Sequence, residues 1–205
     1  DGFDNEFKQR VEIENDASRL IQDINFEKIT ISEMVQATKR LKGQSATGDD
    51  GVSNFLLKNM SYNFLKIVVQ LCNLCLSNSQ VPHTWKISRV ILIPKGTKCR
   101  TDPKNYRPIS ITSCLGKLIE RIIAQRLVES LEINKTLIPQ QSGFRRHRRT
   151  TDNLVFLSQN ILQTFNKKGC KALLLNFDIQ AAFDSVWHEG LIFKMQNYKI
   201  PKYII

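Results

Sequence analysis

Two short apolar runs interrupt a chain whose hydrophobic spacing is otherwise helical, and this change of period limits the possible folds most. Residues 88–95 and 106–112 are rich in β-branched side chains, which favour strands. The polar connector 96–104 between them favours a hairpin with a long loop. Because Pro108 has no backbone N–H, the second run suits an edge or irregular strand. We therefore expect an α+β chain with one hairpin set among helices.

Helical periodicity lies on both sides of this hairpin. Thr30 and Glu33 have the spacing of a capping box, so a helix is expected to start there. The clearest amphipathic pattern runs from Leu115 to Leu131. Further helices are expected within residues 1–29, 54–60, 64–76 and 154–165, with a Gly- and Asp-rich loop over 43–51.

A short apolar run at residues 172–177 comes directly before Asp178. It is too short for a typical helix, so we expect a buried strand. A carboxylate at the end of a buried strand is held rigidly while its oxygens reach the edge of the core. Such hard oxygen ligands suit a divalent metal, although a solvated or helix-capping Asp is the simpler interpretation of this residue alone.

The chain is strongly basic, with 30 Lys+Arg against 19 Asp+Glu and a formal net charge of +11. This excess favours a polyanionic partner, most often nucleic acid, the alternative being a basic solvated surface without a partner. The densest charge is the run of Arg145, Arg146, Arg148 and Arg149 around His147. Guanidinium groups at this density repel one another unless phosphates or carboxylates neutralise them.

The five cysteines are expected to be free thiols in a reducing compartment, because their number is odd and the sequence does not start with a signal peptide. Cys72 and Cys75 form a CxxC, but no second CxxC or HxxxH follows to complete a zinc site. We expect both to be buried as small apolar side chains. No apolar run approaches the roughly 18 residues of a membrane span. An intracellular protein of the nucleus or cytoplasm is expected, and the missing initiator Met suggests a piece of a longer chain.

Five short motifs resemble those of one known family and occur in that family's order. They are the segments 46–52, 93–95, 105–110, 141–145 and 177–186. The last reads Phe-Asp-Ile-Gln-Ala-Ala-Phe-Asp-Ser-Val and resembles the first palm motif of reverse transcriptases from non-LTR (LINE-like) retrotransposons. The others resemble, in order, the family's N-terminal extension motif, its first fingers strand, its fingers motif and a Gly-Phe-Arg motif near the template.

The resemblance implies part of a right-hand polymerase. Residues 1–53 would form the helical N-terminal extension, 54–170 the fingers with their β-hairpin and helices, and 171–205 the start of the palm with its first strand. The implied activity is RNA-directed DNA synthesis by two-metal nucleotidyl transfer with Mg²⁺. The implied partners are an RNA template, a DNA primer and dNTPs, without a membrane or an obligate protein partner.

Roles for single residues also follow from the resemblance. Asp178 would hold both magnesium ions, and the backbone carbonyl of Ile179 would add one ligand. Phe183 would stack under the incoming sugar and exclude a 2′-hydroxyl, although a core aromatic is the alternative. Asp184 is expected to make structural hydrogen bonds. The phosphates of the nucleotide would be cradled by the backbone amides of Gln180, Ala181 and Ala182.

Basic residues would serve the nucleotide and the template. Lys95 and Arg107 would grip the triphosphate, the alternative being a solvated pair on the hairpin. Contacts to template or other nucleic acid would come from Gln141, Gly143, Phe144, Arg145, Arg146, Arg148 and Arg149.

One carboxylate cannot hold two metal ions in this arrangement. The family's Tyr-x-Asp-Asp motif does not follow Asp184, and the Asp49-Asp50 pair matches a different motif. We therefore expect the 205 residues alone to be inactive in polymerisation. Alternatives are a non-catalytic nucleic-acid-binding remnant of a transposable element, a group II intron or telomerase-type polymerase, and a plain helical protein. The last does not account for five ordered motifs.

Overall fold

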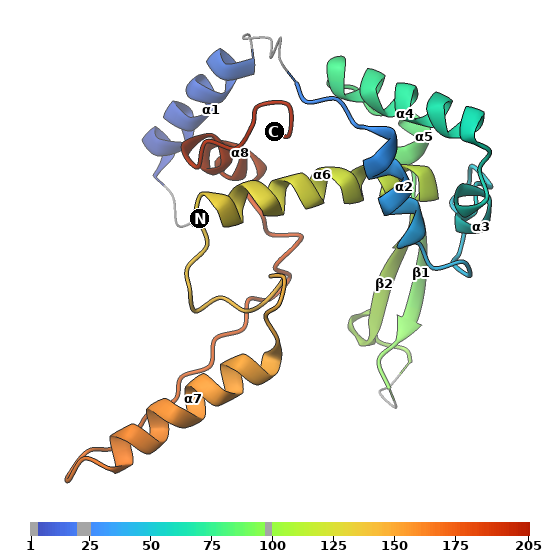
Figure 1. Ribbon diagram of the computed structural model, residues 1–205. Helices are drawn as coiled ribbons and strands as arrows, with labels where there is room; N and C mark the ends of the chain where they lie inside the picture. Colours follow the sequence, from blue (N-terminus) through green and yellow to red (C-terminus); the bar gives the residue numbers. More distant parts are fainter. Residues whose placement is uncertain (1–3, 20–25, 97–99) are drawn as a thin grey trace. The chain divides into compact units, whose positions relative to one another are not determined.

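The computed structural model describes residues 4–19, 26–96 and 100–205, so Cys99 lies outside the described residues. The described chain is mainly helical with one small sheet, which confirms the α+β class (Figure 1). Its elements are α1 Asn5–Arg19, α2 Ile31–Lys39, α3 Asn54–Lys58, α4 Tyr62–Ser77, α5 His83–Lys86, β1 Arg89–Pro94, η1 Pro103–Asn105, β2 Tyr106–Ile111, α6 Cys114–Ile133, α7 Thr150–Phe165 and α8 His188–Asn197. Within the described ranges, no helix is both long and apolar enough to cross a membrane.

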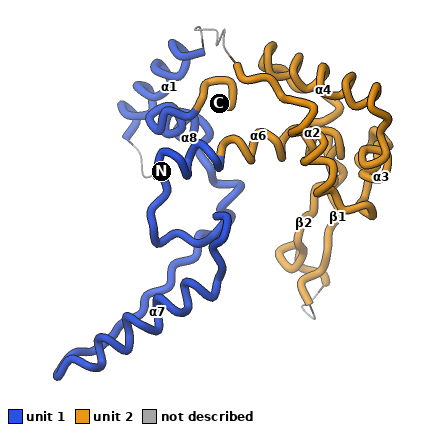
Figure 2. Tube along the Cα trace, in the orientation of Figure 1, with its two compact units in different colours: residues 1–21, 128–200, 205 blue, residues 22–127, 201–204 orange. Residues whose placement is uncertain are grey.

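The chain divides into two compact units (Figure 2). Unit 1 comprises residues 1–21, 128–200 and 205, and unit 2 comprises residues 22–127 and 201–204. The division between extension, fingers and palm stays a prediction, because it concerns polymerase subdomains rather than compactness.

Unit 2 holds the main hydrophobic core, to which α2, α4 and α6 contribute most of the side chains. The expected capping box is present: Thr30 Oγ1 accepts from the Glu33 N–H, and Glu33 Oε2 accepts from the Thr30 N–H at 2.9 Å. Cys72 and Cys75 are buried in this core, as predicted. Burial, with a smaller contribution from Cys75, raises the pKa of Cys72 to about 12, so its thiol stays protonated.

The loop before α3 is tied to the start of α6 by a close backbone approach. A Cβ added to Gly48 would lie 2.8 Å from the Ser113 backbone nitrogen. Ser113 is buried, and its hydroxyl accepts from the Gly116 N–H at 3.1 Å, which caps α6. The thiol of Cys114 lies 3.7 Å from the Ala46 carbonyl oxygen that it faces. Any residue with a Cβ at position 48 would require the backbone to shift, so only glycine fits this approach to Ser113.

The predicted hairpin is present, as β1 pairs antiparallel with β2. Ile93 lies opposite Arg107, and Pro108 lies opposite Leu92. Both strands are edges of a two-stranded sheet, which satisfies the restriction that Pro108 imposes. Side chains on both faces of the hairpin are exposed apart from the ends of β2.

In unit 1, α1 packs against α8 through aromatic and polar contacts. The Phe7 ring lies 6.1 Å from Trp187 and 6.0 Å from Phe193, both edge-on. Glu189 accepts from Asn15 at 2.7 Å and from Arg19 at 2.8 Å. Helix α8 was not expected from the sequence, because its apolar residues do not follow a clear helical stripe.

The predicted buried strand at residues 172–177 is wrong. These residues form no regular element and are exposed, with Leu173 at 85% and Phe177 at 89%. A strand needs backbone hydrogen bonds to a neighbour, and the described ladder joins only β1 and β2. The helix expected at residues 154–165 does form, as α7, but none of its residues is buried. The apolar pattern therefore predicted the helix α7 correctly. At residues 172–177 the apolar pattern did not produce a strand, because no other strand in the described part of the chain pairs with it.

Candidate nucleotide and nucleic-acid sites

Lys95 and Arg107 lie on one face of the hairpin. Residues 93 and 107 are direct cross-strand partners, and side chains on a strand alternate, so residue 95 shares their face. The Lys95 N–H extends the ladder by donating to the Asn105 carbonyl at 2.7 Å. Its amino group donates to the Lys104 carbonyl at 2.8 Å, whereas Arg107 is exposed. The register of the hairpin thus assigns these two predicted residues to the same face.

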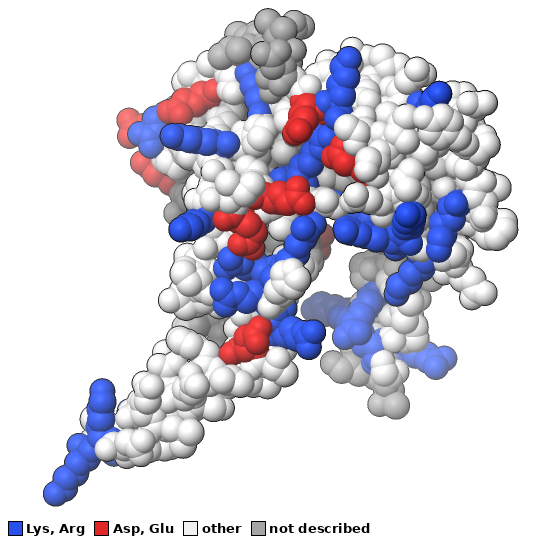
Figure 3. All heavy atoms as spheres, viewed as in Figure 1, with Lys and Arg blue, Asp and Glu red and all other residues white. Residues whose placement is uncertain are grey.

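Positive charge gathers over the same hairpin (Figure 3). The sequence places Arg89, Lys95, Arg100, Lys104 and Arg107 on or beside β1 and β2, against the single carboxylate of Asp102. The Asp102 carboxylate makes a local hydrogen bond, accepting from the Lys104 N–H at 2.9 Å. An exposed face of this charge attracts phosphates without regard to sequence.

Asp178 lies in the exposed segment that follows α7 rather than at the end of a strand. Residues 180–185 after it form turns, with Ala181 in a left-handed conformation at φ +52 and the Ser185 N–H donating to the Ala181 carbonyl at 3.0 Å. Phe183 is 86% exposed, so the alternative that it is a core aromatic is wrong for this structure. Asp178 belongs to unit 1 and the Lys95–Arg107 pair to unit 2, so their convergence stays a prediction.

The described residues do not by themselves form a two-ion metal site. No group of three or more His, Cys, Asp or Glu side chains in the described ranges converges to hold a metal ion. Asp178 is exposed and Ile179 beside it is 73% exposed. A carboxylate and a backbone carbonyl are both hard oxygen ligands. This set fits part of a magnesium site and requires further carboxylates to complete it.

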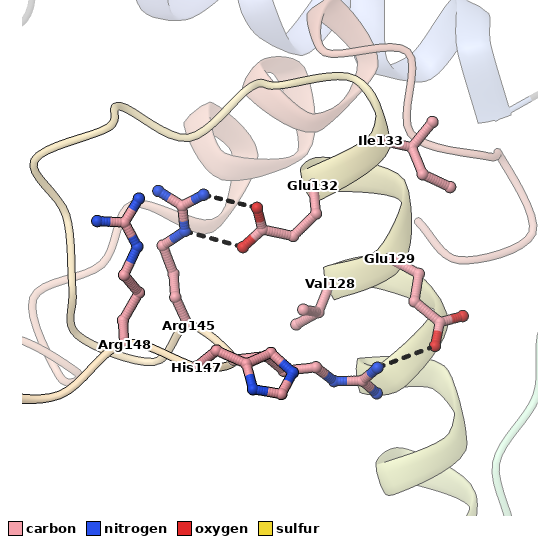
Figure 4. Close-up of a pocket in the computed structure, with 8 residues that line it drawn as sticks. Val128, Glu129, Glu132, Ile133, Arg145, His147 and Arg148 are labelled. Atoms are coloured by element: carbon pink, nitrogen blue, oxygen red, sulfur yellow. Dashed lines mark hydrogen bonds and ion pairs between the residues drawn. The ribbon is translucent and has the colours of Figure 1, made fainter.

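The basic loop, which we define as residues 141–149, is held against α6 by Arg145, whose charge is neutralised by one carboxylate of that helix. Arg145 Nε and Nη2 donate to the two oxygens of Glu132 at 2.8 and 2.6 Å (Figure 4). Arg145 Nη1 donates to the carbonyl of Ile138 at 3.0 Å, and the Arg145 side chain is 12% exposed. The hydrogen bond from Arg145, helped by the charges of Arg145 and Arg148, holds the pKa of Glu132 below its ordinary value.

The other arginines of the basic loop are more exposed than Arg145. Arg146 lies 3.4 Å from Glu129 with both side chains about half exposed, and Arg148 and Arg149 are exposed. A pocket of about 410 Å³ lies between the loop and α6. It is lined by Val128, Glu129, Glu132, Ile133 and residues 145–148.

Ser142 and Asp152 fasten the basic loop to α7. The buried Ser142 hydroxyl donates to Asn153 Oδ1 at 2.7 Å, and the Arg149 N–H donates to Asp152 Oδ2 at 2.7 Å. The exposed Gln141 side chain donates to the Gly143 carbonyl at 3.2 Å. Glu132 was not among the residues expected from the sequence, although the density of arginines required carboxylates or phosphates nearby. The available signal was two glutamates, at 129 and 132, on the helix just before the loop.

A sequence model described as reverse transcriptase (RNA-dependent DNA polymerase) matches residues 93–205. The matched range contains the hairpin from Ile93 onward, the basic loop and Asp178.

Three relatives come from mobile elements of Drosophila melanogaster. The probable RNA-directed DNA polymerase from transposon BS is 36% identical over 177 residues, which cover 85% of this chain and 19% of the relative. The RNA-directed DNA polymerase from mobile element jockey is 31% identical over 85% of this chain and 19% of its own length. The Pol polyprotein from the type-2 retrotransposable element R2DM is 27% identical over 84% of this chain and 15% of its own length. This chain therefore spans at most about a fifth of each relative.

Proposed function

Because this chain belongs to the reverse transcriptase (RNA-dependent DNA polymerase) family, we propose that it forms part of an enzyme that copies retrotransposon RNA into DNA. The match of residues 93–205 to the family is the observation that carries this proposal. The relatives named as RNA-directed DNA polymerases support it. Residues 1–53 would serve as the N-terminal extension, 54–170 as the fingers and 171–205 as the start of the palm.

The hairpin face is proposed to bind the triphosphate of the incoming dNTP. Arg107 is exposed, and Lys95 shares its face, so both cations are placed to offset phosphate charge. To do so, the Lys95 amino group must give up its hydrogen bond to a backbone carbonyl. Exchanging a neutral acceptor for a phosphate is favourable, because charge-assisted hydrogen bonds are roughly twice as strong.

Asp178 is proposed to contribute one carboxylate to the magnesium site, with the Ile179 carbonyl beside it. Magnesium supplies charge stabilisation of the phosphoryl group when it is bound. Ala181 is left-handed, and left-handed residues are a component of anion-binding turns, so the amides of residues 180–182 are proposed to cradle a phosphate. The exposed ring of Phe183 is free to stack under a sugar and select against a 2′-hydroxyl.

The 205 residues alone are proposed to be inactive, because they supply one of the carboxylates that two ions require. A second candidate is a non-catalytic nucleic-acid-binding remnant, which the net charge of +11 favours equally. The two differ in whether a Tyr-x-Asp-Asp motif follows in the reading frame. Primer extension by the 205-residue chain with dNTPs would contradict the proposed inactivity.

The experiment that tests the proposal uses the chain extended through the Tyr-x-Asp-Asp motif, with an RNA template and a DNA primer. Asp178→Asn should abolish primer extension while leaving binding to the duplex unchanged. Glu120→Gln is the matched control, since it removes a carboxylate charge at an exposed position of α6. Phe183→Ala should raise ribonucleotide incorporation. Activity retained in Asp178→Asn would remove Asp178 from the catalytic site.

A further inference from the structure

Arg145 is committed to contacts inside the protein. Four hydrogen bonds leave its guanidinium: two to Glu132, one to the Ile138 carbonyl at 3.0 Å and one to the Gln141 carbonyl at 3.5 Å. A guanidinium has five N–H groups, so little of its donor capacity remains for a phosphate. The bidentate geometry also makes this pair stronger than a single contact. Arg145 therefore joins the last turns of α6 to the start of the basic loop.

The residue before Arg145 has the opposite character. Phe144 is 96% exposed and adopts a left-handed conformation with φ +60. A bulky side chain pays for such a backbone conformation, and an apolar ring in water has no compensating contact. The conformation persists because the flanking residues are fixed, by Ser142 on one side and Arg145 on the other. Strained, exposed residues of this kind occur preferentially at ligand-binding positions.

The surroundings of Phe144 define the ligand chemistry. Arg148 and Arg149 are exposed a few residues away, and the loop carries no acidic side chain. An aromatic ring beside exposed cations matches single-stranded nucleic acid, in which a base stacks on the ring and phosphates meet the cations. A duplex keeps its bases stacked internally and offers no free face to the ring.

We propose that Phe144 stacks on an unpaired base of single-stranded RNA, and that Arg145 is a positioning residue that holds Phe144 outward rather than a phosphate ligand. This inference rests on the proposed function, which supplies RNA as the substrate, and assigns separate tasks to neighbouring residues of the basic loop. Arg148 and Arg149 provide the phosphate contacts.

Substitution of Glu132 distinguishes a phosphate-binding Arg145 from a positioning Arg145, because the two predict opposite changes in RNA affinity. In Glu132→Ala a phosphate-binding Arg145 would be released, so RNA binding would tighten. A positioning Arg145 instead loses its anchor, and binding to single-stranded RNA weakens several-fold despite the gain of net positive charge. Glu120→Ala is the control, because it removes an equal charge from the exposed part of α6. The charge-swapped pair Glu132→Arg with Arg145→Glu should restore much of the binding.

The salt dependence gives an independent readout that a general loss of structure does not imitate. Arg148→Ala should make the slope of log Kd against log salt shallower by about 0.7, the value for one phosphate contact on a single strand. Arg145→Ala should weaken binding without changing the slope. Circular dichroism of each variant confirms that the helices are retained. A slope change in Arg145→Ala equal to that of Arg148→Ala would overturn the assignment.

Substitutions of Phe144 should leave the fold intact, because its side chain is exposed. Phe144→Ala should weaken binding to single-stranded RNA roughly tenfold and leave duplex binding unchanged. Phe144→Trp should retain binding, whereas Phe144→Leu, which is apolar but not aromatic, should not. Unchanged binding in Phe144→Ala, or tighter binding in Glu132→Ala, overturns this inference alone. Absence of RNA binding by the unmodified chain at low salt overturns the proposed function as well.

Discussion

Arg126 is the arginine whose removal should cost unit 2 the most stability. Its side chain is 10% exposed, and it donates to Glu33 Oε1 at 2.8 Å and Oε2 at 2.9 Å. It also donates to the carbonyls of Glu27 at 2.5 Å and Lys28 at 3.0 Å, in the segment that leads into α2. Its guanidinium lies 5.8 Å from the centroid of the Tyr203 ring. Arg126→Ala therefore detaches α6 from the start of α2 and from residues 201–204.

The expected loss of unfolding free energy in Arg126→Ala depends on how well Glu33 is solvated once its partner is removed. Each hydrogen bond to a charged group contributes about 1.5–3 kcal/mol, but such terms are not additive. Breaking a buried ion pair costs about 3–5 kcal/mol. The Glu33 side chain is 31% exposed, so water replaces part of the lost contact and the lower end applies. We expect a loss of about 3 kcal/mol, or a Tm lower by about 6–12 °C for a chain of this size.

Urea unfolding monitored by circular dichroism measures this loss. Arg121→Ala is the matched control, since Arg121 is exposed on the same helix and should change stability by less than about 0.5 kcal/mol. A double-mutant cycle with Glu33→Ala should give a coupling energy above about 1 kcal/mol. A loss for Arg126→Ala no larger than that of the control would refute the reasoning.

The same pair should respond to acid. Burial alone raises the pKa of Glu33, but the hydrogen bonds from Arg126 and Thr30 outweigh it and leave the pKa below its ordinary value. A carboxyl whose pKa is depressed by folding contributes stability above its unfolded pKa of about 4.3, and the contribution is lost as pH falls through the folded pKa. The difference between the unmodified chain and Arg126→Ala should therefore shrink below about pH 4.

Two further perturbations test other contacts. Gly48→Ala should destabilise unit 2 by about 1–3 kcal/mol, because the new Cβ would lie 2.8 Å from the Ser113 nitrogen; Gly43→Ala, where a Cβ meets nothing within 4 Å, should cost almost nothing in the same unfolding experiment, and equal effects would contradict the contact. Alkylation at pH 8 followed by peptide mapping should label the exposed Cys170 and spare the buried Cys72, whose pKa is raised to about 12; rapid labelling of Cys72 in the folded chain would show that its burial is incomplete.

Local signals made part of this structure predictable. The capping box at Thr30 and Glu33, the hairpin with Pro108 at an edge and the amphipathic α6 each depend on residues close together in the sequence. Such patterns specify an element before any tertiary contact forms. The two expected strands placed Lys95 and Arg107 on one hairpin, whereas the register that sets Arg107 opposite Ile93 was not predicted.

Long-range and partner-dependent features were not predictable in this way. Helix α8 is held by contacts such as Asn15 with Glu189, which are 174 residues apart and leave no periodic trace. The ion pair between Glu132 and Arg145 joins residues 13 positions apart and depends on how the basic loop folds back onto α6. Residues 172–177 carry a strand composition, yet a strand forms only when another strand pairs with it. A sequence pattern indicates which secondary structure a segment can adopt, and contacts with the rest of the chain determine whether that structure forms.

The apolar run at residues 172–177 has a consequence for how the chain behaves at high concentration. Its leucines and Phe177 face water, and its residues form no regular element, so like segments of other molecules can associate with it. Mutual repulsion from the net charge of +11 opposes such encounters. Salt weakens that repulsion, because the Debye length falls to about 3 Å at 1 M. Light scattering should therefore rise with added salt, and charge rather than covered apolar surface keeps these molecules apart.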